Sequence, residues 1–79
     1  MSLQEAERRI AECRDTQNLE LDLGNLELTA IPTSVFELSH LQVLLLGYFN
    51  RHPNRNRIET LPESITQLTN LQRLDLSYN

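Results

Sequence analysis

The sequence predicts an α/β fold in which one helix precedes a repeated unit that contains short strands. Three observations support this prediction: the first residues have helical spacing, two long stretches of the chain align with each other, and leucine fills about a fifth of the 79 positions. A chain of this length forms one small soluble domain. Its net charge of −4 argues against a general nucleic-acid-binding surface, which would need Lys and Arg clustered across the fold.

The N-terminal segment has the spacing of an amphipathic helix of about 12 residues. Ser2 followed by Glu5 favours a capping box at its start. We expect the apolar stripe of this helix to cover the first repeat, which otherwise presents Leu19, Leu21 and Leu23 to water. The stripe consists of Leu3, Ala6, Ile10 and Cys13.

The repeat emerges when the chain is aligned with itself. Residues 31–46 align with residues 61–76 at an offset of 30, whereas residues 21–23 align with residues 44–46 at an offset of 23. The difference of 7 indicates a seven-residue insertion within 47–56. The underlying period is therefore 23 residues, and the alternating leucines favour short strands with one buried face.

The repeat resembles the leucine-rich repeat over residues 18–79. The resemblance rests on two motifs, Leu71-x-x-Leu74-x-Leu76-x-x-Asn79 and Asn56-x-Ile58-x-x-Leu61-Pro62. It implies a solenoid, a short right-handed β/α horseshoe segment with a parallel β-sheet whose strand leucines point inward. A buried asparagine side chain is expected to bond the backbone where the chain leaves each strand.

The resemblance also divides the chain. A single leucine-rich-repeat domain at 1–79 would comprise a capping helix at 1–17, a first repeat at 18–40, a second repeat at 41–70 and a truncated third repeat at 71–79. The first repeat departs from the pattern, since Asn18 replaces its leading leucine and Leu26 replaces its asparagine. Residues 5–10 and 19–23 resemble those of bacterial, particularly cyanobacterial-type, repeat proteins, some of which continue into Roco-family GTPases.

No polar capping repeat follows the third strand. We therefore expect this end to be covered, either by further repeats of a longer solenoid or by a second copy in a two-fold, end-to-end homodimer. The last apolar layer would consist of Ile65, Leu68, Leu71, Leu74 and Leu76.

The sequence indicates no catalytic chemistry, cofactor or metal. It contains no Gly-rich phosphate loop and no Ser/His/Asp arrangement, and its single cysteine points to a reducing, cytoplasmic compartment. We expect Cys13 to be a small core residue, with a reactive thiol beside Arg9 and Arg14 as the alternative. We expect His40 to be a solvated loop residue. Neither a membrane span nor a secretion signal is indicated.

The first candidate surface for a protein partner is the concave face of the sheet. The resemblance implies that the variable strand positions project there, so that Val43 and Leu45 form an apolar centre with a charged rim. The alternative is a few surface hydrophobes without a role. The candidate residues are Glu20, Asp22, Val43, Leu45, Arg73 and Asp75.

The second candidate surface is the insertion. Its arginines contribute +3 and leave −7 on the rest of the chain, and arginine beside aromatic residues suits a carboxylate or phosphate on a partner. The alternative is a solvated loop with an aromatic side chain packed against the repeats. The candidate residues are Tyr48, Phe49, Arg51, Arg55 and Arg57.

The resulting functional prediction is a protein–protein interaction module or scaffold, not an enzyme, that binds through the concave sheet and the inserted loop. Two alternatives to this prediction stay open. The first is that the chain is the N-terminal regulatory fragment of a larger Roco-type GTPase, and the second is that it is a self-assembling structural module.

Overall fold

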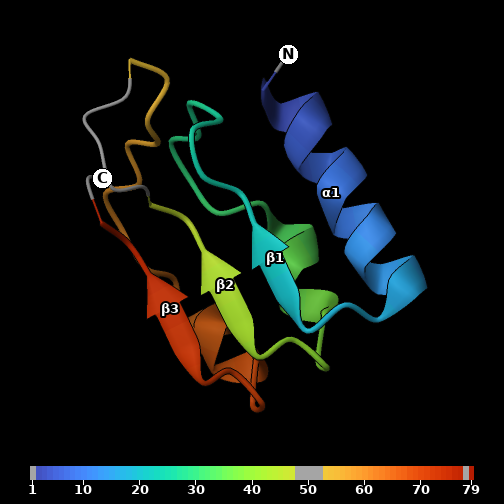
Figure 1. The fold of residues 1–79 in the computed structure, drawn as a ribbon. Coiled ribbons are helices and arrows are strands. Elements are labelled where there is room, and N and C mark those ends of the chain that lie inside the picture. The colour runs from blue at the N-terminus through green and yellow to red at the C-terminus, as the bar shows by residue number, and fades with distance from the viewer. Residues whose placement is uncertain (1, 48–52, 78) are drawn as a thin grey trace.

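A computed structural model describes residues 2–47, 53–77 and 79. Figure 1 shows a three-stranded sheet with one long helix beside its first strand. In chain order the elements are α1 (Ser2–Thr16), β1 (Glu20–Asp22), the 3-10 helix η1 (Thr33–Glu37), β2 (Val43–Leu45), the 3-10 helix η2 (Glu63–Gln67) and β3 (Arg73–Asp75).

The three strands are parallel and lie in the order β1-β2-β3. Glu20 pairs with Val43, and Val43 pairs with Arg73. These pairings separate neighbouring strands by 23 and 30 residues, the two offsets found in the sequence. The expected parallel sheet is therefore confirmed, and each repeat contributes one strand to it.

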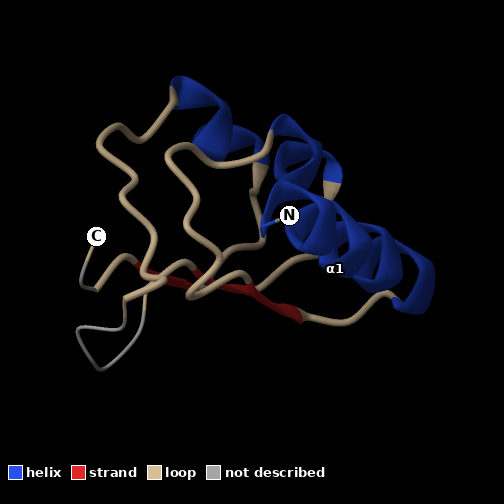
Figure 2. Ribbon diagram, turned by 90° about the horizontal axis from the view of Figure 1, so that it is seen from above, coloured by secondary structure: helices blue, strands red, loops and turns tan. Residues whose placement is uncertain are grey.

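The sheet forms one layer of the molecule and the helices form the other (Figure 2). Leu21 and Leu44 point from the strands into the space between the layers and are buried. Pro32 and Pro62 stand immediately before η1 and η2, where a residue without an N–H and with a fixed φ suits the start of a helical turn. The short strands and short helices thus enclose a core built mainly of leucine.

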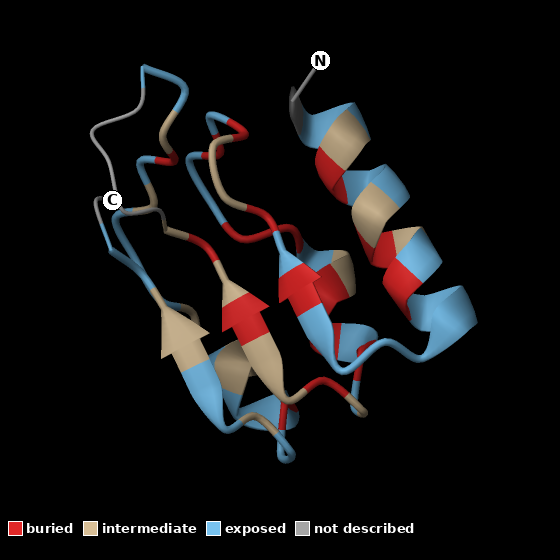
Figure 3. Ribbon diagram, viewed as in Figure 1, coloured by how far each residue is buried: buried red, intermediate tan, exposed pale blue. Residues whose placement is uncertain are grey.

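Burial falls from the α1 end of the molecule to the β3 end (Figure 3). At the first end, Ala6, Ile10 and Cys13 of α1 are buried, and α1 contacts β1 and η1. At the other end, Leu74 is half-buried and Leu76 is 37% exposed. The described part of the chain therefore covers its first strand well and its last strand poorly.

Two leucines depart from the expected burial. Leu3 is 58% exposed and Leu19 is 49% exposed, although both were expected to be covered. Leu3 lies on the rim of a groove formed with the 27–33 segment. Leu19 follows the end of α1, where Gln17 adopts a left-handed φ of 57° and turns the chain, so α1 does not extend over it. The prediction was wrong for these two residues and right for Leu21 and Leu23.

The helix start also differs from the prediction. α1 has 15 residues, not about 12, and already includes Ser2. The carboxylate of Glu5 accepts hydrogen bonds from Arg8 and Arg9, at 2.6 and 2.8 Å. The side chain of Ser2 lies outside the described residues, so the expected capping box stays a prediction.

Asn56 confirms the expected role of the repeat asparagine. Its side chain is 2% exposed, accepts hydrogen bonds from the backbone N–H groups of Leu26 and Leu28, and donates to the carbonyls of Leu23 and Leu46. One amide group thus fixes the backbone where the chain leaves both β1 and β2.

Candidate binding surface

The six residues proposed for the concave face lie on the outer, solvent-facing side of the sheet. The strand register arranges them in two rows, because Val43 pairs with a residue on either side and Leu45 does the same. One row is Glu20, Val43 and Arg73, and the other is Asp22, Leu45 and Asp75.

The centre of this surface is apolar and its flanks are charged. Val43 and Leu45 are half-buried on the middle strand, whereas Glu20, Asp22 and Arg73 are exposed on the outer strands. Alternation along each strand produces this arrangement, since the residue between two outward-facing positions points into the core.

Asp75 is held in place at one edge of this surface. Its carboxylate accepts hydrogen bonds from the backbone N–H of Ser77 at 2.9 Å and from the Ser77 hydroxyl at 2.6 Å. Arg73 lies 3.8 Å from the same carboxylate. The bonds from Ser77, assisted by the charge of Arg73, lower the pKa of Asp75 below its ordinary value. Asp75 therefore carries a fixed negative charge.

Asp22 occupies the equivalent place at the opposite edge. Its carboxylate accepts a hydrogen bond from the Gly24 N–H at 2.8 Å, which is the same local turn that Asp75 makes with Ser77. Arg9 of α1 donates to the backbone carbonyl of Asp22 at 2.9 Å and to Glu5 at 2.8 Å. Arg9 is therefore part of the rim of this surface, a role that sequence spacing did not reveal.

An open groove of about 390 Å³ runs between α1 and β1. It adjoins the charged edge of the sheet, because Glu20 and Asp22 line it. The groove is lined by Arg9, Glu12, Cys13, Thr16, Asn18, Glu20, Leu21 and Asp22.

The second proposed surface is only partly described. Tyr48, Phe49 and Arg51 lie outside the described residues. Arg55 and Arg57 line a separate groove of about 490 Å³ together with Ile58, Glu59 and Asn79.

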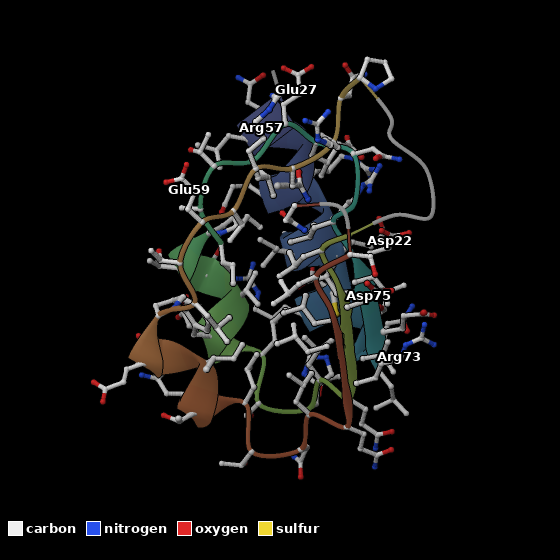
Figure 4. All side chains as sticks on the ribbon, turned by 90° about the vertical axis from the view of Figure 1, so that its left-hand side faces the viewer. Asp22, Glu27, Arg57, Glu59, Arg73 and Asp75 are labelled. Atoms are coloured by element: carbon white, nitrogen blue, oxygen red, sulfur yellow. The ribbon has the colours of Figure 1, made fainter. Side chains whose placement is uncertain are left out.

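The described arginines of this second surface are held near the first repeat. The backbone N–H of Arg57 donates to the carbonyl of Leu28 at 2.7 Å, which ties the segment after the insertion to the loop that follows β1. Figure 4 shows Arg57 near Glu27, apart from the sheet residues Asp22, Arg73 and Asp75. The structure therefore keeps the described part of this surface separate from the sheet face.

Cys13 and His40 form a contact that the sequence did not predict. The Cys13 sulfur lies 3.7 Å from Nε2 of His40, and the thiol donates to the carbonyl of Asn18 at 3.2 Å. Cys13 is 4% exposed, and burial raises the pKa of its thiol. The core role expected of Cys13 is confirmed. His40, expected to be solvated, is half-buried against it.

The described part of the chain has neither a metal-binding cluster nor a helix that could span a membrane. Within residues 2–47, 53–77 and 79, no three His, Cys, Asp or Glu side chains lie where they could hold a metal ion together. No helix in these same segments is long and apolar enough to cross a bilayer.

Each leucine-rich unit of this chain adds one parallel strand to the sheet, and the side chain of Asn56 bonds the backbone of two successive units. This architecture is that of a repeat protein. The family model of the leucine-rich repeat matches residues 17–79. The chain belongs to the leucine-rich repeat family. Comparisons with curated proteins and with solved structures gave no match. Leucine-rich repeats generally mediate protein–protein interactions and are typically not catalytic.

Proposed function

We propose that this chain binds a protein partner on the outer face of its sheet. The observation that carries the proposal is the pair Val43 and Leu45, two half-buried apolar side chains in the middle strand with charged residues on both neighbouring strands. An apolar centre within a polar rim is the usual anatomy of a protein interface.

The charges on this face indicate the chemistry of the partner. Glu20, Asp22 and Asp75 outnumber the two arginines of the rim, Arg73 and Arg9. Ser77 holds the carboxylate of Asp75 through two hydrogen bonds. A partner that places an apolar side chain over Leu45 and basic side chains beside it would match both the shape and the charge of the face.

A displayed library of random peptides tests this proposal. We expect peptides selected on the wild-type chain to share an apolar residue flanked by Lys or Arg. Leu45→Glu should weaken their binding by about 30-fold, which corresponds to the roughly 2 kcal/mol of a central hot spot. Leu3→Glu is the matched control, because it makes the same change at an exposed leucine on α1. Equal binding by wild type and Leu45→Glu would place the site elsewhere.

The inserted loop is proposed as a second surface, for an acidic partner. Its support is that Arg55 and Arg57 line one groove beyond the sheet face. Peptides that carry a carboxylate or phosphate should bind the wild-type chain and bind an Arg55→Ala, Arg57→Ala variant at least about tenfold more weakly. Loss of the same peptides in Leu45→Glu would instead indicate one continuous surface.

Four finer predictions, which follow from the sequence and from its resemblance to bacterial and Roco-type repeat proteins, stay proposals. They are a solenoid scaffold, a bacterial origin, a cytoplasmic location and a place ahead of a Roco-type GTPase. A P-loop sequence in frame after residue 79 of the gene would support the last of these.

A further inference from the structure

The apolar centre of the outer sheet face has different charges on its two sides. On β1, both outward residues are acidic, Glu20 and Asp22. On β3, the two outward residues carry opposite charges, Arg73 and Asp75. Figure 4 shows Asp22, Arg73 and Asp75 on the same side of the sheet. Each of the four charged residues pairs with an apolar residue of β2, so β1 places two negative charges beside the centre and β3 places no net charge there.

The opposite charges of β3 are already in contact with each other. Nη2 of Arg73 lies 3.8 Å from Oδ2 of Asp75, and Ser77 donates two further hydrogen bonds to the Asp75 carboxylate. The side chain of Asp75 is only 20% exposed, so little of its carboxylate is accessible to a partner. A cation of the partner would also meet the positive charge of Arg73. The β3 side of the face is therefore unfavourable for a basic side chain.

The carboxylates of β1 are differently placed. Within residues 2–47, 53–77 and 79, no arginine side chain forms an ion pair with Glu20 or Asp22. The Asp22 carboxylate accepts one hydrogen bond, from the N–H of Gly24. Both residues are exposed. Two exposed carboxylates at successive outward positions of one strand attract a cation to this side of the face.

The charges in the middle of α1 balance one another. Arg9 donates to the backbone carbonyl of Asp22 at 2.9 Å, and it also bonds the carboxylate of Glu5 at 2.8 Å. Arg8 is shared between Glu5 and Glu12. Two positive charges on the helix thus face two negative ones. The excess negative charge at this edge of the sheet comes from β1.

A groove beside β1 offers space for the side chain of a cation. The open groove of about 390 Å³ between α1 and β1 is lined by Glu20 and Asp22 on the sheet and by Glu12 on the helix. Neighbouring strands lie about 4.8 Å apart. The long side chain of a Lys or Arg can span that distance from a segment that lies over β2. Charge and space therefore favour the same edge.

We propose that the partner lies across the strands, with an apolar residue over Leu45 and a Lys or Arg directed to the groove between α1 and β1. This orientation rests on the binding face proposed above and adds a direction to it, because the cation lies beside β1 and not beside β3. The partner is thus a segment with its essential basic residue on one side of the apolar residue. A second basic residue on the other side would lie beside Arg73 and add no affinity.

Matched amide substitutions at the two edges test this direction. The probe is a set of peptides selected on the wild-type chain from a displayed library in which lysine is the only basic residue. Asp22→Asn and Asp75→Asn each remove one negative charge and keep an oxygen for the N–H of Gly24 or Ser77. We expect Asp22→Asn to weaken binding about three- to fivefold, as for an exposed charge pair, and Asp75→Asn to weaken it less than about twofold. Weakening by Asp75→Asn that equals or exceeds that by Asp22→Asn would overturn the proposal.

Cross-linking locates the cation directly. A carbodiimide joins a lysine amine of the bound peptide to a contacting carboxylate as an amide, and mass spectrometry of the digested product identifies that carboxylate. We expect the link at Glu12, Glu20 or Asp22, the acidic residues that line the groove. A link mainly at Asp75, or at a carboxylate away from this face, would contradict the proposed direction.

Leu45→Glu separates this orientation from the binding face on which it rests. If Leu45→Glu leaves peptide binding unchanged, the sheet face is not the site and both proposals fail. If Leu45→Glu weakens binding while Asp22→Asn does not, the face is the site and only the direction is wrong.

Discussion

Replacing Asn56 with alanine should remove a substantial part of the stability of this domain. The change deletes four buried hydrogen bonds, two accepted from Leu26 and Leu28 and two donated to Leu23 and Leu46. The carbonyl of Leu46 keeps a donor, because the side chain of Asn79 also bonds to it at 3.1 Å. Three buried backbone groups are therefore left without a partner.

The size of the effect follows from these three groups. An unpaired buried polar group costs about 1–3 kcal/mol, so we expect the free energy of unfolding to fall by at least about 3 kcal/mol. A domain of this length has roughly 4–12 kcal/mol in total. Urea unfolding followed by circular dichroism measures the change, at one low protein concentration so that self-association does not contribute.

Asn79→Ala is the control for this prediction. Asn79 makes the equivalent bonds in the third repeat, to the carbonyls of Leu46 and Leu76 and from the N–H of Ile58, but it is exposed. Water can replace these bonds, so we expect a loss below about 1 kcal/mol. If Asn56→Ala costs no more than Asn79→Ala, the reasoning from buried, unpaired backbone groups is refuted.

Three further predictions concern single residues. A Cβ atom at Gly47 would overlap the backbone of Ser77, so Gly47→Ala should lower the unfolding free energy by about 1–3 kcal/mol in the same urea assay. Hydrogen bonds from Arg8 and then Arg9 lower the pKa of Glu5 from 4.5 to about 2. The stabilisation by Glu5 is therefore complete above pH 4.5 and is lost as the pH falls to 2, so the thermal midpoints of wild type and Glu5→Gln should converge over that range. Iodoacetamide should alkylate Cys13 at least about tenfold more slowly in the folded chain than in urea, because its thiol is buried and its pKa raised. Equal rates would show that the thiol is accessible.

The parallel sheet could be predicted because the spacing between equivalent leucines of successive repeats determines which residues pair. Leu21 and Leu44 are 23 residues apart, and Leu44 and Leu74 are 30 residues apart. These are the two offsets of the alignment, so the paired positions follow from the alignment alone. The alternation of inward and outward side chains follows from the same register. This is why the six outer-face residues are brought together in two rows.

Contacts that depend on how α1 docks could not be predicted. Helical spacing identifies a stripe, but it does not say how far the stripe extends over the repeats, and so Leu3 was wrongly placed in the core. The contact between Cys13 and His40 and the bond from Arg9 to Asp22 join α1 to segments outside it. No periodicity relates these residues, because each pair is set by the packing angle of the helix and not by the repeat.

The hydrogen bonds of Asn56 also have a consequence for the order of events during synthesis. Leu26 leaves the ribosome 30 residues before Asn56 supplies the acceptor for its N–H. At about 5–20 residues per second, the first repeat waits roughly 2–6 seconds for the side chain that completes its turn. During that interval its leucines have no finished core to enter. We therefore expect the nascent first repeat to stay open to chaperones that bind apolar segments until Asn56 has left the ribosome.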